Sequence, residues 1–261
     1  MKKLLMGAML CGLASAAFAQ EAVQVQEWTT TLDLSYTCKY IWRGFDRLDN
    51  AGAFQPSIDF LHESGFGANL WMSYPERGGS TSMIDSRVNA TEYNYTLYYT
   101  GTALSDCWET NYRLGWRYFD FIDTASEDAD LQEVFIEAEM PKLTGTPMTP
   151  HLAVYQLWPA QGGGAVSDTA GTIYLAGFSY GWTFDEMPEL PMSFSWDIVF
   201  NDGAGGSEVD HDWSHMVWGL KTQMQMGTAK LVPAVYFQNS FDNSVNNEDE
   251  LWGSLSYLLT F

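Results

Sequence analysis

The chain has 261 residues and is strongly acidic, with 33 Asp and Glu against 12 Lys and Arg and a formal net charge of −21. A protein with this charge repels nucleic acid, which we exclude as a partner. After the N-terminal leader no segment approaches the ~18 apolar residues that a membrane-spanning helix needs. Aromatic residues nevertheless make up 15% of the chain, an excess that suits a lipid interface.

The N-terminus has the features of a secretory signal peptide. Lys2 and Lys3 precede an apolar run over 4–18, and the sequence Ala-Phe-Ala ends at Ala19. This order of charge, apolar run and small residues predicts export and cleavage after Ala19.

From Trp28 onward, about twelve segments alternate between apolar and polar residues, each roughly ten to fourteen residues long, which suits a tilted membrane-spanning strand. In the first segment one face carries Leu32, Leu34, Tyr36, Cys38, Tyr40 and Trp42, opposite Asp33, Ser35, Thr37, Lys39 and Arg43. The pattern recurs over 54–63, 66–74, 92–100, 108–118 and 133–140, and more weakly in the six segments that follow. No helix of useful length is expected.

The connections between these segments alternate in length. Long polar stretches such as 76–89 and 122–130 follow the odd-numbered segments, whereas shorter gaps such as 63–65 follow the even-numbered ones. Long outer loops and short periplasmic turns are typical of outer-membrane barrels, and an even strand count places both termini in the periplasm.

The C-terminal segment 251–261 alternates in the same way and ends on Phe261, with Tyr257 on the same face. A terminal strand of this kind is expected to close a barrel and to be recognised by the barrel-assembly machinery.

A secreted two-sheet sandwich would also alternate, but a dry core would favour Val and Ile over so many Trp and Tyr. The sequence therefore predicts an all-β, antiparallel transmembrane β-barrel of about 12 strands, with 1–19 as signal peptide, 20–27 as a short periplasmic leader and 28–261 as the barrel.

Residues 35–73 resemble the opening of the TorF-type porin family. The resemblance lies in Ser-Tyr-Thr-Cys-Lys-Tyr-Ile-Trp-Arg-Gly-Phe over 35–45, Phe-Gln-Pro-Ser-Ile-Asp over 54–59, and Gly-Phe-Gly-Ala-Asn-Leu-Trp-Met-Ser over 65–73. It covers about two strand pairs, and it implies an outer-membrane barrel with a pore role. It transfers no catalytic residue to this chain.

Charged residues on the fifth and sixth segments are predicted to face one another inside the barrel. If this strand pair is centred near residue 125, Arg117 lies opposite Glu133 and Arg113 opposite Glu137. Such pairs either bridge the wall and fix its register or form a charged constriction. The pore-lining candidates are Arg43, Asp59, Arg113, Arg117, Glu133, Glu137 and Glu139.

The segment 208–215 is the most enzyme-like part of the chain, because it combines Ser214 and His215 with several carboxylates. Neighbouring residues on one strand point to opposite faces, so we expect Ser214 and His215 to form no working pair without a partner from elsewhere. Glu208, Asp210 and Asp212 are weaker candidates for a loop cation site, although their spacing matches no compact loop motif.

The functional prediction is a porin-like channel for passive diffusion of small hydrophilic solutes, weakly cation-selective and without a cofactor. A barrel of about 12 strands permits a narrow pore without requiring one. The alternatives are a non-conducting structural or adhesion barrel with acidic loops and, more remotely, an enzyme acting on membrane lipid. The expected partners are outer-membrane lipid, the assembly machinery and small solutes; the sequence leaves solute identity and oligomeric state open.

Overall fold

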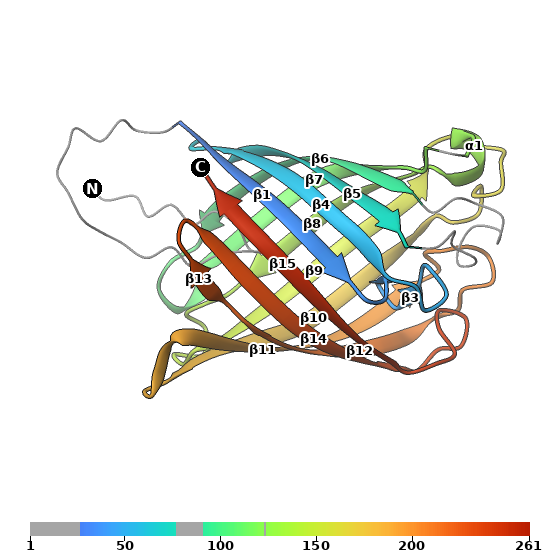
Figure 1. Cartoon of the computed structure of the whole chain (residues 1–261). Coiled ribbons are helices and arrows are strands. Elements are labelled where there is room, and N and C mark those ends of the chain that lie inside the picture. Colours follow the sequence, from blue (N-terminus) through green and yellow to red (C-terminus); the bar gives the residue numbers. More distant parts are fainter. Residues whose placement is uncertain (1–26, 77–90, 123) are drawn as a thin grey trace.

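The computed structural model describes residues 27–76, 91–122 and 124–261. Within these residues, twelve antiparallel strands close into a barrel (Figure 1). The strands follow one another in chain order, β12 and β13 being two parts of one interrupted strand that pairs with β14. β1 closes the barrel by pairing with β4 on one side and β15 on the other. The predicted fold is confirmed, whereas the signal peptide 1–19 lies outside the described residues.

The strand bounds, in chain order, are β1 Trp28–Thr37, β2 Ile41–Trp42, β3 Phe45–Asp46, β4 Ala53–His62, β5 Phe66–Pro75, β6 Glu92–Ala103, β7 Thr110–Asp120, β8 Leu131–Glu139, β9 Met148–Pro159, β10 Gly171–Phe184, β11 Met187–Asp202, β12 His211–Thr222, β13 Met224–Met226, β14 Ala229–Ser240 and β15 Glu250–Thr260. Within 27–76, 91–122 and 124–261, helix is confined to the short turns η1 Asp106–Trp108 and α1 Ser126–Ala129. No helix in the described residues is long and apolar enough to cross a membrane.

The two faces of the wall follow the predicted alternation. On β6, Tyr95 and Leu97 are exposed on the outer face, whereas Glu92, Asn94 and Thr96 are buried on the inner face. An outward apolar face and an inward polar face are the pattern of a barrel whose exterior meets lipid. The same division recurs on the other wall strands, with Ile58, Leu114, Ile136, Leu152, Tyr174, Leu220, Val235 and Leu255 on their outward apolar faces.

β1 begins and β15 ends at one end of the barrel, and the connections that contain β3 and α1 lie at the other (Figure 1). We call these the termini end and the loop end. At the termini end, the backbone N–H and C=O of Phe261 pair with Thr30 at 2.9 and 3.1 Å. The last residue therefore extends the ladder between the first and last strands.

The first wall strand is shorter than predicted. β1 ends at Thr37, and the chain then turns into the barrel, so Tyr40 and Trp42 do not lie on the outer face. Tyr40 is buried and both rings pack against inward side chains of the wall. The prediction of a strand continuing to Arg43 was wrong. Tyr40 and Trp42 continue the alternation that places apolar residues on the outer face of β1, but their rings pack inside the barrel.

Candidate functional site

Residues 38–52 form what we call the inward hairpin, whose two short strands, β2 and β3, pair through Ile41 with Asp46 and Trp42 with Phe45. The two-residue turn places Arg43 at φ 48° and Gly44 at φ 97°. Positive φ at both central positions is the geometry that matches the twist of a tight hairpin. A side chain at position 44 would lie 2.5 Å from the His215 ring, so this close approach also requires glycine.

The inward hairpin crosses the interior of the barrel. It leaves the wall at β1, and Arg43 at its tip contacts Glu133 on β8 and Tyr155 on β9. In the closed strand order β9 lies six strands from β1 in either direction, so the tip reaches the opposite wall. The lumen is therefore narrowed by a segment of the chain itself, near the loop end.

The tip is held by one buried carboxylate shared between two arginines. Glu133, which is 0% exposed, accepts hydrogen bonds from Arg43 Nη1 at 2.6 Å and Nη2 at 3.0 Å. It also accepts one from Arg117 Nη1 at 2.7 Å. The Arg43 guanidinium lies 3.7 Å from the centre of the Tyr155 ring, a cation-π contact. These groups form what we call the Glu133 cluster.

Aromatic packing seats the rest of the hairpin. The Tyr40 ring lies 5.8 Å from that of Trp71, and its hydroxyl donates to Glu92 at 3.1 Å. Burial, followed by the nearby Glu92 charge, raises the pKa of the Tyr40 hydroxyl, so it remains a donor. The Trp42 ring meets Phe119 edge-on at 5.7 Å. Leu48 is also buried, which makes the hairpin a packed part of the fold.

The hairpin also bonds to the last strands and the last loop. Lys39 pairs with Glu250 on β15 at 2.7 Å. The carbonyl of Gly44 accepts from the side-chain amides of Gln238 at 2.9 Å and Asn246 at 3.1 Å. Contacts on β8, β9, β14 and β15 thus fix the hairpin from several sides of the wall.

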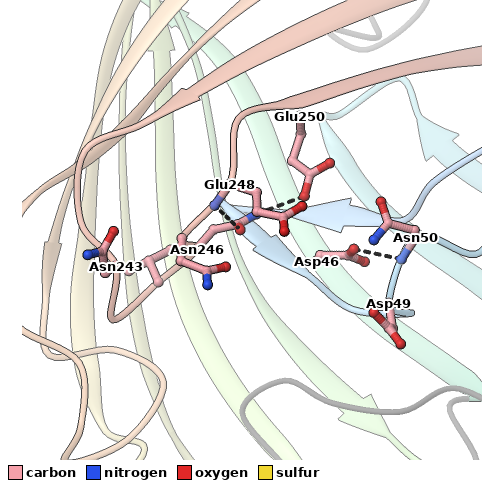
Figure 2. A pocket seen from close by; sticks show the side chains of 9 residues that line it. Asp46, Asp49, Asn50, Asn243, Asn246, Glu248 and Glu250 are labelled. Atoms are coloured by element: carbon pink, nitrogen blue, oxygen red, sulfur yellow. Dashed lines mark hydrogen bonds between the residues drawn. The ribbon is translucent and has the colours of Figure 1, made fainter.

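A cavity of about 250 Å³ opens between the hairpin and the last loop (Figure 2). Its lining is acidic and amide-rich, formed by Asp46, Asp49, Asn50, Asn243, Val245, Asn246, Asn247, Glu248 and Glu250. Figure 2 shows the Asp46 carboxylate accepting from the backbone N–H of Asn50, at 2.7 Å. Desolvation raises the pKa of the Asp46 carboxyl, although the N–H groups of Asn50 and Leu48 oppose the shift. The cavity gives the loop end an acidic surface.

The predicted register of the charged wall is confirmed. Arg117 lies opposite Glu133 and Arg113 opposite Glu137 between β7 and β8. The second pair is looser, with 3.8 Å between Arg113 Nη1 and Glu137 Oε2. Both of its members keep some solvent exposure, 16% and 21%.

The remaining wall candidates also lie on inward faces. Asp59 on β4 accepts from the Tyr98 hydroxyl at 2.7 Å, and Arg113 lies 4.0 Å from the centre of the same ring. Glu139 lies opposite Asn111 on one side and His151 on the other. Their role in lining a pore remains a proposal.

Ser214 and His215 depart from the prediction that they face opposite ways. A bulge between β11 and β12 shifts the register at Ser214, and both residues are buried. The Ser214 hydroxyl lies 2.8 Å from His215 Nδ1. The prediction failed because a bulge adds an unpaired residue to one strand and so interrupts the alternation. The pair sits beneath Gly44 and serves packing.

The loop cation candidates are not assembled into a metal site. In the described part of the chain, no group of three or more His, Cys, Asp or Glu side chains could hold a metal ion. The Asp212 carboxylate accepts from the Trp213 backbone, and Asp210 donates its N–H to Ser244. Glu208 lies in the same loop, between β11 and β12.

Sequence reasoning missed the aromatic and polar partners of the hairpin, chiefly Tyr155, Trp71 and Gln238. Each lies on an inward face of its strand. The alternation of the sequence already assigns these residues to the inner face. An aromatic ring or amide on that polar face is a signal that another part of the chain packs against it. The identity of that partner was not readable.

No protein-family model and no curated protein matches the sequence. Among solved structures, the chain is similar to the NanC porin, with a TM-score of 0.53 at 8% identity over 87% of this chain and 98% of that one. It is also similar to the KdgM porin, at 0.52 and 9% identity over 88% and 99%, and to "KdgM porin in complex with disordered oligogalacturonate", at 0.51 and 8% identity over 88% and 99%. These likenesses show a small porin-type barrel. All three of these structures are described as porins.

Proposed function

We propose that the chain is an outer-membrane channel for passive diffusion of small hydrophilic solutes, narrowed by the inward hairpin. The observation that carries the proposal is a closed barrel with an apolar exterior and charged side chains that keep solvent exposure inside it. Arg113, Arg117 and Glu137 are 16–21% exposed although they face the interior. Interior charges that reach water line a polar path rather than a dry core. The TorF-type resemblance over 35–73 supports the same assignment.

We further propose a weak preference for cations, set mainly by the mouth. The loops 121–130, 160–170, 203–210 and 241–249 contain several Asp and Glu residues and no Lys or Arg. The acidic cavity of Figure 2 adds to them. A cation therefore meets an attractive potential before it reaches the hairpin. The Glu133 cluster opposes this trend, because two arginines share one carboxylate.

The first test is ion selectivity in a planar bilayer. Under a potassium chloride gradient the reversal potential should indicate preference for K⁺ by about two- to fivefold, falling as salt rises because screening is effective beyond about 8 Å at physiological ionic strength. A preference for anions would contradict the proposal that the acidic mouth sets the ion selectivity. It would indicate that Arg43, Arg113 and Arg117 set it instead.

A second candidate, a non-conducting structural or adhesion barrel, is favoured by one specific observation. The inward hairpin reaches the wall opposite its origin and is buried at Tyr40, Phe45 and Leu48. Such a segment could fill the lumen rather than narrow it. Absence of single-channel steps with correctly folded protein would favour this candidate over the channel.

For assembly we propose that the last strand carries the insertion signal, with Tyr257 and Phe261 on its apolar face and the termini end in the periplasm. Deleting Phe261 should lower the amount of folded barrel in the outer membrane, because this residue completes the ladder to Thr30 between the closing strands. The amount is measured as the band that shifts on boiling in a detergent gel. Phe66→Ala is the matched control, since Phe66 is similarly exposed at the same end of the barrel. Equal levels of both variants would contradict the signal.

A further inference from the structure

The interior of the barrel is filled across its width near the loop end. Each of the twelve wall strands has an inward side chain at this level that is no more than 6% exposed, among them Thr37 on β1, Phe119 on β7, Ile173 on β10 and Gln238 on β14. Water does not reach these side chains from inside the barrel. In the described part of the chain, the loop end is therefore closed around the whole wall.

Toward the termini end the same interior is open to water. The side chains of Arg113 and Glu137 are 16% and 21% exposed, and those of His151 and Asp197 are 20% and 22% exposed. All four lie nearer the termini end of their strands than the buried level does. Over the described residues, the interior is thus a chamber that opens at the termini end and is closed at the loop end.

The inward hairpin forms the centre of the closed level, and Trp42 is its most connected side chain. Trp42 packs against three hydrophobic clusters at once. The first surrounds Phe119 and includes residues from the loops after β7, β9 and β11. The second contains Leu48 at the root of the hairpin, and the third joins Phe45 to Val245 in the last loop. One indole ring therefore connects the hairpin, the far wall and the outer loops.

The hairpin is also the part of this level that can move without opening the wall. β2 and β3 pair with each other in a two-stranded sheet that is separate from the barrel. Side chains hold the hairpin to the rest of the barrel, through Arg43 with Glu133, Trp42 with Phe119, and the amides that donate to the Gly44 carbonyl. Two-stranded ribbons are marginally stable alone, so these contacts decide where the hairpin sits. Their loss breaks no backbone hydrogen bond of the barrel wall.

We propose that this conformation is the closed state of the channel, and that the inward hairpin is a gate sealed by Trp42. Apolar constrictions close channels by excluding water. The inference rests on the proposed channel function, because solutes that cross the barrel require the hairpin to leave its seat on the far wall. The Glu133 cluster is then the latch that holds the tip of the closed gate.

The first test is Trp42→Ala, followed by single-channel recording in a planar bilayer. The fraction of time spent open should rise by about tenfold, because the truncation removes packing from the closed state and not from the open one. Trp252→Ala is the matched control, since the Trp252 ring stacks on Tyr236 of the neighbouring wall strand at 5.3 Å. It should leave the open fraction unchanged. An equal rise in both variants would overturn Trp42 as the seal.

The second test ties the tip of the hairpin to the far wall. Arg43→Cys and Tyr155→Cys place two thiols where the guanidinium lies 3.7 Å from the centre of the ring. The two free cysteines, Cys38 and Cys107, are replaced by Ser. Glu133 keeps its ion pair with Arg117, which supports folding of this variant. Joining the two thiols with a short bismaleimide should lower the open fraction by about tenfold, because it holds the tip in its closed position.

The control for this test is the same variant labelled with N-ethylmaleimide, which modifies both thiols without joining them. Its open fraction should stay at the unlabelled level. Equal current from the bismaleimide-joined and the singly labelled proteins would show that the hairpin does not move, and would overturn the gate although the channel stands. Folded protein that passes no current in any of these forms would overturn the channel itself, and the gate with it.

Discussion

Shortening the inward hairpin is expected to raise single-channel conductance by about two- to threefold, because it removes the segment that narrows the lumen. The change is replacement of Ile41–Asp46 by two glycines. The join is short, since the Arg47 backbone N–H already donates to the Tyr40 carbonyl at 2.9 Å. The deletion removes Arg43 and Trp42, and with them the contacts to the far wall. Conductance is measured on purified protein in a planar bilayer.

The matched control deletes Gly162 and Gly163, which lie in another connection at the loop end and would have nothing within 4 Å of an added Cβ. Its conductance should equal that of the unmodified chain. Steps that appear only in the shortened variant would identify the hairpin as a plug and favour the non-conducting candidate. Equal conductance in all three proteins would place the narrowest point elsewhere.

The wall could be predicted from the sequence because each of its strands obeys a local rule. Alternation assigns Arg113, Arg117, Glu133 and Glu137 to one face, and centring the strand pair near residue 125 decides which of these residues lie opposite one another. The register then follows by counting, and the observed pairs agree with it.

The hairpin could not be predicted because its fold depends on residues distant in sequence. Tyr40 and Trp42 continue the apolar phase of β1, and their inward direction is decided by Trp71, Phe119 and the Glu133 cluster. Arg43 followed by Gly44 marked the turn, but no local pattern distinguishes a loop that leaves the barrel from one that enters it. The bulge at Ser214 could not be predicted either, because a single unpaired residue leaves no recognisable pattern in the sequence.

Replacing Glu133 with Gln should lower the free energy of unfolding by about 3 to 5 kcal/mol, the usual cost of removing one partner from a buried ion pair. Arg43 and Arg117 would keep their charges in a site where their side chains are only 13% and 19% exposed. Unfolding is followed by tryptophan fluorescence in urea with the protein in lipid vesicles, where the midpoint and slope give the free energy.

Glu137→Gln is the matched control for Glu133→Gln, because it makes the same chemical change two inward positions further along the same strand. Its charged partner Arg113 lies at 3.8 Å and both side chains are partly solvated. The Tyr155 hydroxyl, which donates to Glu137 at 3.0 Å, can still donate to the Gln carbonyl, so the loss should stay within about 1 kcal/mol. A double-mutant cycle between Arg117 and Glu133 should show a smaller loss for the pair than the sum of the single losses, since the double variant leaves fewer uncompensated charges. Equal losses for the two Gln variants would mean that the carboxylate does not anchor the hairpin. The tip of the inward hairpin would then be held mainly by the aromatic contact between Trp42 and Phe119. Additivity in the cycle would mean that Arg117 and Glu133 do not interact.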